Sequence, residues 1–218
     1  IQTLFAFAKA EKYLPADWHG MEGVPLWKVH DAAIEIFTPE EMGVLLSRAP
    51  KNLVPFLAIG AFAGLRSAEI ERLDWEKVNL ESGFITVDAS IAKTNSRRLV
   101  PITPNLKAWL KDYKQARGLV VELANVVNAI RRLVDTTRPV DPKNPLKLLA
   151  PAVAWKHNAL RHSFISYRVA DVQNVAQVAL EAGNSPHMIF QHYRELVRPA
   201  EAKAWFAITP ESTKALRE

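Results

Sequence analysis

The sequence has no cysteine among its 218 residues, which excludes disulfide bonds and metal sites built on thiolate ligands. Its six histidines do not show the HExxH spacing of zinc hydrolases or any similar ligand spacing. The sequence also lacks a secretory signal and any apolar run long enough to span a membrane. From these absences we expect a cytoplasmic protein with no membrane partner, and the sequence shows no recognisable metal-ligand pattern.

The residues that are present fit a globular protein with a modest basic excess. Hydrophobic residues make up 49% of the chain, and its length suits one large domain, or one domain with a fragment of another. The net charge of +5 permits binding to nucleic acid without establishing it. Because the sequence begins with isoleucine, we expect it to be a piece of a longer chain.

The N-terminal part of the sequence changes character twice. Residues 1–14 are expected to form the end of a helix, since their apolar side chains leave little polar face. Residues 15–37 contain two prolines and two glycines and are expected to form a linker. Residues 38–41, Thr-Pro-Glu-Glu, form a capping box that opens a helix ending near Pro50.

The rest of the chain combines helical patterns with one β-rich stretch. Residues 83–102 hold two β-branched runs and predict a β-hairpin. Residues 136–151 carry four prolines and are expected to form a long extended loop. Helices are expected over residues 52–63, 68–73, 104–117, 119–134, 171–182 and 199–206, and the stretch 155–164 is expected to enter a helix that ends near residue 170. The sequence therefore predicts an α+β fold that is mainly helical, with a small antiparallel sheet.

Two stretches place charged side chains in unusual positions. Arg66 lies in a tight corner between two predicted helices, with Glu69 one turn later. This arrangement is either a surface ion pair of small energetic value or a functional arginine. Lys93, Arg97 and Arg98 stand in the hairpin, whose polar tip is either a solvated turn or a basic finger that contacts a phosphate backbone.

A third stretch combines helix signals with a tyrosine among polar neighbours. Gly183 is placed to end one helix, and Ser185 with Pro186 is placed to start the next. Tyr193 then falls about two turns into this short helix. It is either part of the core or a candidate nucleophile, because nearby cations favour the phenolate.

Four short motifs stand in a fixed order along the chain. They are Gly64-Leu65-Arg66-Ser67-Ala68-Glu69-Ile70, Lys93-Thr94 before Arg98-Leu99-Val100-Pro101-Ile102, Leu160-Arg161-His162-Ser163-Phe164, and Gly183-Asn184-Ser185 with Tyr193 nine residues after Asn184. Each motif is weak alone. Together, over residues 36–206, they resemble the catalytic domain of tyrosine recombinases, the phage integrase family.

The resemblance implies how the chain is divided and what it binds. Residues 1–35 would be the last helix of a DNA-clamping core-binding domain plus a linker, and residues 36–218 would be the catalytic domain with its tail. The implied partner is double-stranded DNA in the nucleoid, bound by a homotetramer whose subunits exchange the tail from Pro199 onward. The isolated fragment is expected to be a monomer. The alternative for Trp205 and Phe206 is packing back on their own domain.

The resemblance also implies the chemistry of a site-specific recombinase that cuts and rejoins DNA strands. Arg66 and Arg161 would hold the non-bridging phosphate oxygens. Tyr193 would attack phosphorus to form a 3′-phosphotyrosyl bond, and Lys93 would protonate the departing 5′ oxygen. The covalent bond keeps the energy of the phosphodiester, so neither ATP nor an essential metal is implied. Supporting roles are expected for Glu69, which would orient Arg66, and for His157, His162 and His192, and DNA contacts for Arg97, Arg98 and Lys156.

Two positions depart from the family pattern. Asn158, three residues before Arg161, stands where the family usually has histidine, and Asn184 stands where it usually has histidine or tryptophan. An asparagine donates hydrogen bonds but takes no proton near neutral pH, so we expect both to face the scissile phosphate as donors. Three alternatives stay open: weaker acid–base catalysis, a nearby histidine as substitute, or a decayed remnant that binds DNA or a partner subunit without cleaving.

Overall fold

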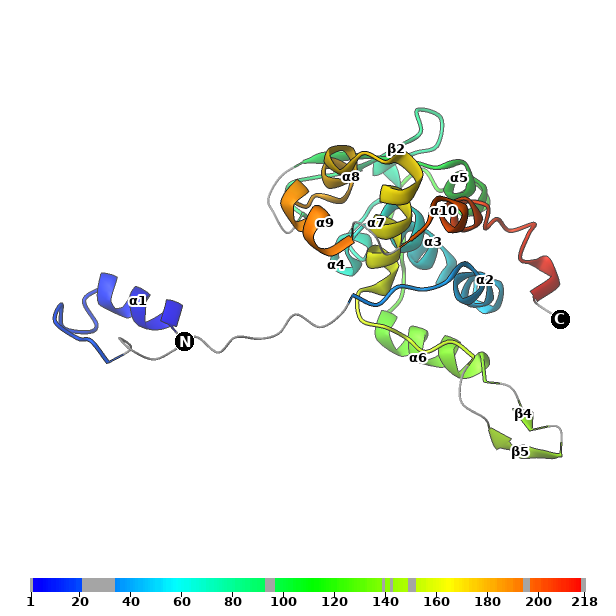
Figure 1. Ribbon diagram of the computed structural model, residues 1–218, viewed down its shortest axis with the longest axis horizontal. Coiled ribbons are helices and arrows are strands. Elements are labelled where there is room, and N and C mark those ends of the chain that lie inside the picture. The colour runs from blue at the N-terminus through cyan, green and yellow to red at the C-terminus, as the bar shows by residue number, and fades with distance from the viewer. Residues whose placement is uncertain are drawn as a thin grey trace. The chain divides into compact units, whose positions relative to one another are not determined.

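The computed structural model describes residues 2–20, 34–92, 97–138, 140–141, 143–148, 152–193 and 197–216. The chain divides into two compact units, Ile1–Ala33 and Ile34–Glu218. Figure 1 labels the helices and strands of both units. Within the described ranges, no helix is long and apolar enough to cross a membrane.

The N-terminal unit is built around the helix α1 (Gln2–Ala10), which ends short of the predicted residue 14. The ring of Phe5 stacks on Trp18, with 4.9 Å between the ring centroids. Leu4 and Phe7 remain 64% and 57% exposed. The apolar surface of α1 is therefore only partly covered within its own unit.

The second unit is mainly helical and carries two small antiparallel sheets. Its helices are α2 (Pro39–Arg48), α3 (Val54–Ala63), α4 (Ser67–Ile70), α5 (Pro104–Leu110), α6 (Val126–Thr136), α7 (Ala159–Val172), α8 (Val175–Ala182), α9 (Pro186–Tyr193) and α10 (Pro199–Phe206), with 3₁₀ turns η1 (Trp75–Lys77) and η2 (Lys214–Leu216). Its strands are β1 (Val78–Asn79), β2 (Phe84–Val87) and β3 (Arg98–Pro101) in one sheet, and β4 (Val140–Asp141) and β5 (Asn144–Leu148) in the other. The predicted α+β class is confirmed.

Helix α3 forms the centre of the second unit, because every one of its residues is buried. A helix that is apolar on all sides has no face left for water. Helix α7 packs along α3, and two glycines permit the close approach (Figure 1). A Cβ added at Gly60 would lie 2.8 Å from Leu160, and one at Gly64 would lie 2.2 Å from the ring of Phe164. This contact fixes the start of α7 against the end of α3.

Helix α10 is anchored in its own unit by Trp205. The indole is fully buried, donates a 3.0 Å hydrogen bond from Nε1 to the carbonyl of Ala61, and stacks on Tyr167 with 4.3 Å between the ring centroids. The hydroxyl of Tyr167 in turn donates to the carbonyl of Phe37 at 2.9 Å. In the isolated chain, the C-terminal helix thus packs on its own domain, the second of the two alternatives.

The predicted hairpin is confirmed, and it belongs to a three-stranded sheet. Ile85 pairs with Val78 on one side and with Val100 on the other, and all three side chains are buried. Strand β1 was missed because two residues are too few to show an alternating pattern. The tip of the hairpin, residues 93–96, lies outside the described residues.

The helix predicted over 119–134 is wrong in its first half. Helix α6 begins only at Val126, where the side chain of Asn125 provides the N-cap. The preceding residues pair with the backbone near η1 instead, as the N–H of Val120 donates to the carbonyl of Leu73 at 2.9 Å. Val120 and Val121 have the spacing of helical residues, but the chain buries them while it is extended.

Three further boundaries differ from the prediction. The stretch 136–151, predicted as a loop, contains the paired strands β4 and β5. The helix predicted over 104–117 stops at Leu110. Helix α7 runs past residue 170, and Gln173, with a left-handed φ of 52°, ends it before α8 begins. These differences leave the described residues of the four motifs on the elements where the sequence placed them.

Candidate active site

Arg161 sits in the first turn of α7 with its guanidinium aimed at the ends of two other helices. Nη1 donates to the carbonyl of Gly64, just past α3, at 2.5 Å, and Nη2 donates to the carbonyl of Ala182, the last residue of α8, at 2.6 Å. Carbonyls at helix C-termini lack intrahelical donors and carry partial negative charge, so they suit a cation. Burial, followed by the nearby cation Arg66, lowers the pKa of Arg161.

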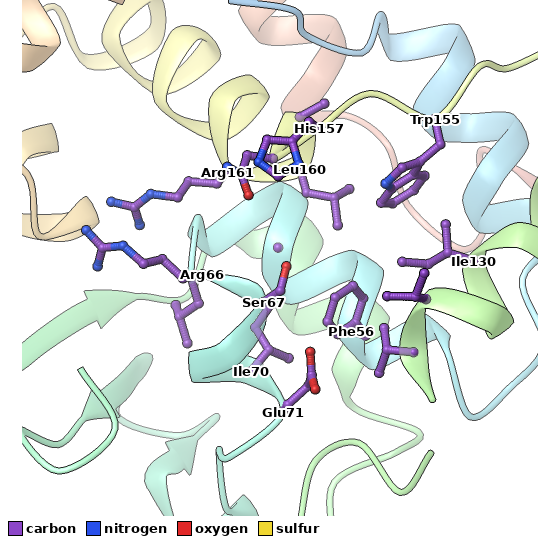
Figure 2. A pocket seen from close by; sticks show the side chains of 16 residues that line it. Phe56, Arg66, Ser67, Ile70, Glu71, Ile130, Trp155, His157, Leu160 and Arg161 are labelled. Atoms are coloured by element: carbon purple, nitrogen blue, oxygen red, sulfur yellow. The ribbon is translucent and has the colours of Figure 1, made fainter. Parts of the chain in front are cut away.

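Arg66 approaches the same place from the corner before α4. Its Nη1 donates to Glu69 Oε1 at 2.9 Å and its Nη2 to the carbonyl of Gly183 at 3.1 Å. The Arg66 side chain is 22% exposed, so part of it faces solvent. Figure 2 shows the side chains of Arg66 and Arg161 extended in the same direction. A single phosphate group could therefore meet both cations.

Asn184 links the two arginines. Its side-chain oxygen accepts from Arg161 Nη2 at 3.0 Å and from Arg66 Nη2 at 3.4 Å. With the oxygen directed at the two guanidinium groups, the amide NH₂ is the part of the side chain left to donate elsewhere. The structure thus places Asn184 beside Arg66 and Arg161, as the spacing of the motifs predicted.

Glu69 joins Arg66 to a third arginine. Its carboxylate is almost fully buried and accepts from Arg98 at 3.1 and 2.6 Å as well as from Arg66. Burial raises the pKa of Glu69, but the hydrogen bonds from Arg98 and Arg66 outweigh it and lower that pKa to about 2. Arg98 also donates from Nε to the carbonyl of Glu181 at 3.2 Å. The carboxylate is therefore ionised and holds two arginines in place.

Tyr193 ends α9 and is buried in a small apolar cluster with Phe164 and Ile189. Its Oη lies 2.6 Å from Nδ1 of His162 on α7. Burial raises the pKa of Tyr193, although the nearby Arg161 acts in the opposite direction. Burial, together with Arg161 and His157, lowers the pKa of His162. Both shifts favour a neutral pair at neutral pH.

Asn158 and His157 lie at the start of α7, on the wall of a cavity of about 310 Å³ that also contacts Arg66 and Arg161 (Figure 2). Asn158 adopts a left-handed conformation with φ of 53°, which asparagine tolerates better than most residues. Both residues are exposed. Each is thus available to a ligand that approaches the two arginines.

The sequence and structural comparisons agree on one family. The sequence model of the phage integrase family matches residues 49–194, about two thirds of the chain. This chain belongs to the phage integrase family. It is 24% identical over 160 residues to the integrase of Shigella phage Sf6, which covers 67% of this chain but only 38% of that protein.

Solved structures show the fold of this phage integrase family member. XerA recombinase gives a TM-score of 0.56 at 17% identity over 94% of this chain and 72% of its own. The integrase from mycobacterium phage Brujita gives 0.55 at 16% identity over 99% and 74%. The Tn1549 transposon integrase, solved in complex with a circular intermediate DNA, gives 0.58 at 18% identity over 92% and 74%.

Two residues of this family member that were predicted to contact DNA have structural partners instead. The side chain of Arg98 is 8% exposed and its guanidinium binds Glu69, so its predicted contact with DNA stays a prediction for a residue that is engaged within the fold. Arg98 stands two residues before the buried Val100, so the alternation of a strand could have placed it on the inner face. Lys156 is likewise held, as Nζ binds the carboxylate of Glu41 and the carbonyl of Ile36.

The remaining predicted residues are spread over different surroundings. Arg97 is 71% exposed, with Nε 3.9 Å from the carboxylate of Asp88, and stays a candidate for DNA contact. His192 is half-buried on α9 beside Tyr193. Lys93, the predicted general acid, lies outside the described residues. No sequence pattern favoured His162 over the other histidines, because only the fold brings it to Tyr193.

Proposed function

We propose that this chain is the catalytic part of a site-specific DNA recombinase or integrase that cleaves and rejoins strands through a 3′-phosphotyrosyl intermediate. The observation that carries the proposal is the convergence of Arg66 and Arg161, from separate elements, on the side chain of Asn184. Tyr193 lies close enough to Arg161 for the two to influence each other's pKa. A nucleophile beside paired guanidinium groups suits attack on a phosphodiester.

In this mechanism each group has one task. Arg66 and Arg161 bind the non-bridging oxygens, on which negative charge grows in the transition state. Asn184 adds a donor through its amide NH₂. Tyr193 forms the bond to phosphorus, and Lys93 protonates the departing 5′ oxygen. Because the new ester keeps the energy of the old one, the religation step needs no external energy source or metal.

The partner in this proposal is double-stranded DNA within a mobile genetic element, in the cytoplasm and its nucleoid. The complex of the Tn1549 transposon integrase with a circular intermediate DNA supports this partner class. Residues 1–35 would be the last helix of a core-binding domain and its linker, and residues 36–218 the catalytic domain. On DNA four subunits would assemble and exchange the segment from Pro199 onward. Such an exchange would place Trp205 of one subunit on the Tyr167 surface of the next.

The test is a nicked DNA substrate whose cleaved end diffuses away, so that a covalent protein–DNA adduct accumulates. We expect an adduct from the unchanged chain and none from Tyr193→Phe, which removes the attacking oxygen and leaves DNA affinity within a factor of about two. An adduct that persists in Tyr193→Phe would assign the nucleophile to another residue.

A second candidate function is a remnant that binds DNA or a partner subunit without cleaving it. The observation in its favour is asparagine at both positions 158 and 184, where proton transfer is lost. The same experiment separates the two functions. A chain that binds the substrate but yields no adduct at any enzyme concentration would be the remnant.

A further inference from the structure

The contact between Tyr193 and His162 joins the third motif to the fourth. The 2.6 Å separation of Oη and Nδ1 is a short hydrogen bond between side chains 31 residues apart. The two rings lie 5.7 Å apart at an angle of 31°. Ile189 on α9 and Phe164 on α7 are fully buried in the same apolar cluster as Tyr193, so the tyrosine ring is held between packed helices.

The direction of this hydrogen bond depends on the tautomer of His162. Burial favours the protonated phenol of Tyr193, and in the tautomer that carries the ring proton on Nε2, Nδ1 of His162 accepts the O–H of Tyr193. In this arrangement the lone pair of Nδ1 points at the proton of the oxygen that would attack. A neutral imidazole placed in this way can act as a general base.

We propose that His162 accepts the proton of Tyr193 as the phenolic oxygen attacks phosphorus, an inference that rests on the proposed function. The O–H bond breaks, its proton moves to Nδ1, and its electron pair forms the new bond to phosphorus. The bond from phosphorus to the 5′ oxygen breaks, and that oxygen takes a proton from Lys93. In religation, the imidazolium of His162 returns its proton to the departing phenolate.

The position of His162 on α7 explains how the chain functions with asparagine at position 158. The backbone N–H of His162 donates to the carbonyl of Asn158 at 3.0 Å, so the two residues are one helical turn apart. Asn158 is the left-handed N-cap of α7, so its side chain does not follow the regular helical spacing. The proposed base thus stands four residues after the position where the family usually has histidine.

The experiment compares His162→Gln, His162→Ala and Lys93→Ala in single-turnover cleavage on two matched substrates. One substrate has the normal bridging 5′ oxygen, and the other has sulfur there, which leaves without being protonated. DNA affinity and the thermal midpoint of each variant report on folding. Glutamine retains a hydrogen-bond acceptor for Tyr193 but holds no proton near neutral pH, so it separates positioning from proton transfer.

We expect both His162 variants to cleave about 10²–10⁴ times more slowly than the unchanged chain on either substrate. Added imidazole should restore part of the rate of His162→Ala, whose cavity can admit the ring. Lys93→Ala should be slow on oxygen and fast on sulfur. The proposal would be overturned if His162→Gln kept the full cleavage rate. It would also be overturned if the His162 variants cleaved the sulfur substrate at the rate of the unchanged chain. An unchanged chain that forms no adduct on either substrate would instead overturn the proposed function, and this proposal with it.

Discussion

Arg98 binds Glu69 through two hydrogen bonds, of 3.1 and 2.6 Å, and both side chains are at least nine-tenths buried. The same carboxylate accepts from Arg66, so strand β3 and the phosphate-binding corner share one anchor. Arg98 further reaches the carbonyl of Glu181 in the last turn of α8. The base of the hairpin, the end of α8 and Arg66 are therefore held as one unit.

This anchor predicts opposite effects for two neighbouring arginines. Arg98→Met should destabilise the fold by about 1–3 kcal/mol, because the buried Glu69 carboxylate loses one of its two arginine partners. Arg97→Met, the matched control at a largely exposed position, should change stability by less than about 0.5 kcal/mol. It should instead lower the salt dependence of DNA binding by about one phosphate contact. Urea unfolding measures the stability of both variants, and DNA titrations at two salt concentrations measure the salt dependence. An Arg98→Met variant as stable as the unchanged chain would contradict the structural role of Arg98.

The residues at the start of α7 give a second prediction. Asn158→Ala should slow cleavage about 10²–10³-fold, because it removes a donor aimed at developing charge. Asn158→His should keep or raise the rate if the cavity admits the ring. His157→Ala is the control, and we expect it to cleave at nearly the full rate. Single-turnover cleavage rates of the three variants are the measurement. A slow His157→Ala together with a full-rate Asn158→Ala would assign the phosphate contact to His157 instead of Asn158.

The pH dependence of cleavage gives a third prediction. Burial, together with Arg161 and His157, lowers the pKa of His162 below its ordinary value of 6.5, so the imidazole is neutral at neutral pH. As the pH falls through that lowered pKa, Nδ1 gains a proton and stops accepting from Tyr193. The single-turnover rate should thus be level near neutrality and drop on the acid side. The drop should vanish in His162→Gln, and a drop that survives there would assign the titration to another group.

The anchoring of α10 gives a fourth prediction. Trp205→Ala should reduce the stability of the isolated chain by about 3–5 kcal/mol, because the fully buried indole contacts Tyr167 and bonds to Ala61. Leu180→Ala, at a side chain 76% exposed, serves as the control and should be neutral. Urea unfolding without DNA measures both. Equal stabilities would show that α10 is not held by its own domain in solution.

The sequence predicted those parts of the fold that local chemistry determines. The capping box that begins with Thr38 opens α2 as expected, with the Thr38 and Glu41 side chains each binding the other's backbone N–H. Gly183, with φ of 65°, ends α8, and Pro186 starts α9. Ends of this kind are read from a few adjacent residues, so one sequence is enough to find them.

Features that depend on distant partners could not be predicted in the same way. Val120 has the spacing of a helical residue, but the chain is extended there because the N–H of Val120 donates a hydrogen bond to the carbonyl of Leu73. Lys156 is a basic residue of the kind that contacts DNA, but its ammonium group forms an ion pair with Glu41, 115 residues earlier. His162 became a candidate base only when the fold brought it to Tyr193. In each case the deciding contact is made across the fold, where sequence spacing carries no signal.

The guanidinium group of Arg161 has backbone carbonyls and an amide oxygen as its partners, whereas Glu69 neutralises one of its two arginine neighbours. Among Arg66, Arg98, Arg161 and Glu69, two positive charges are left without a counterion. A bound phosphodiester brings one negative charge, and the transfer of a proton from Tyr193 to His162 leaves the total charge unchanged. The site therefore carries excess positive charge before DNA binds, so the empty protein should attract small multivalent anions such as sulfate to the place that the scissile phosphate would occupy.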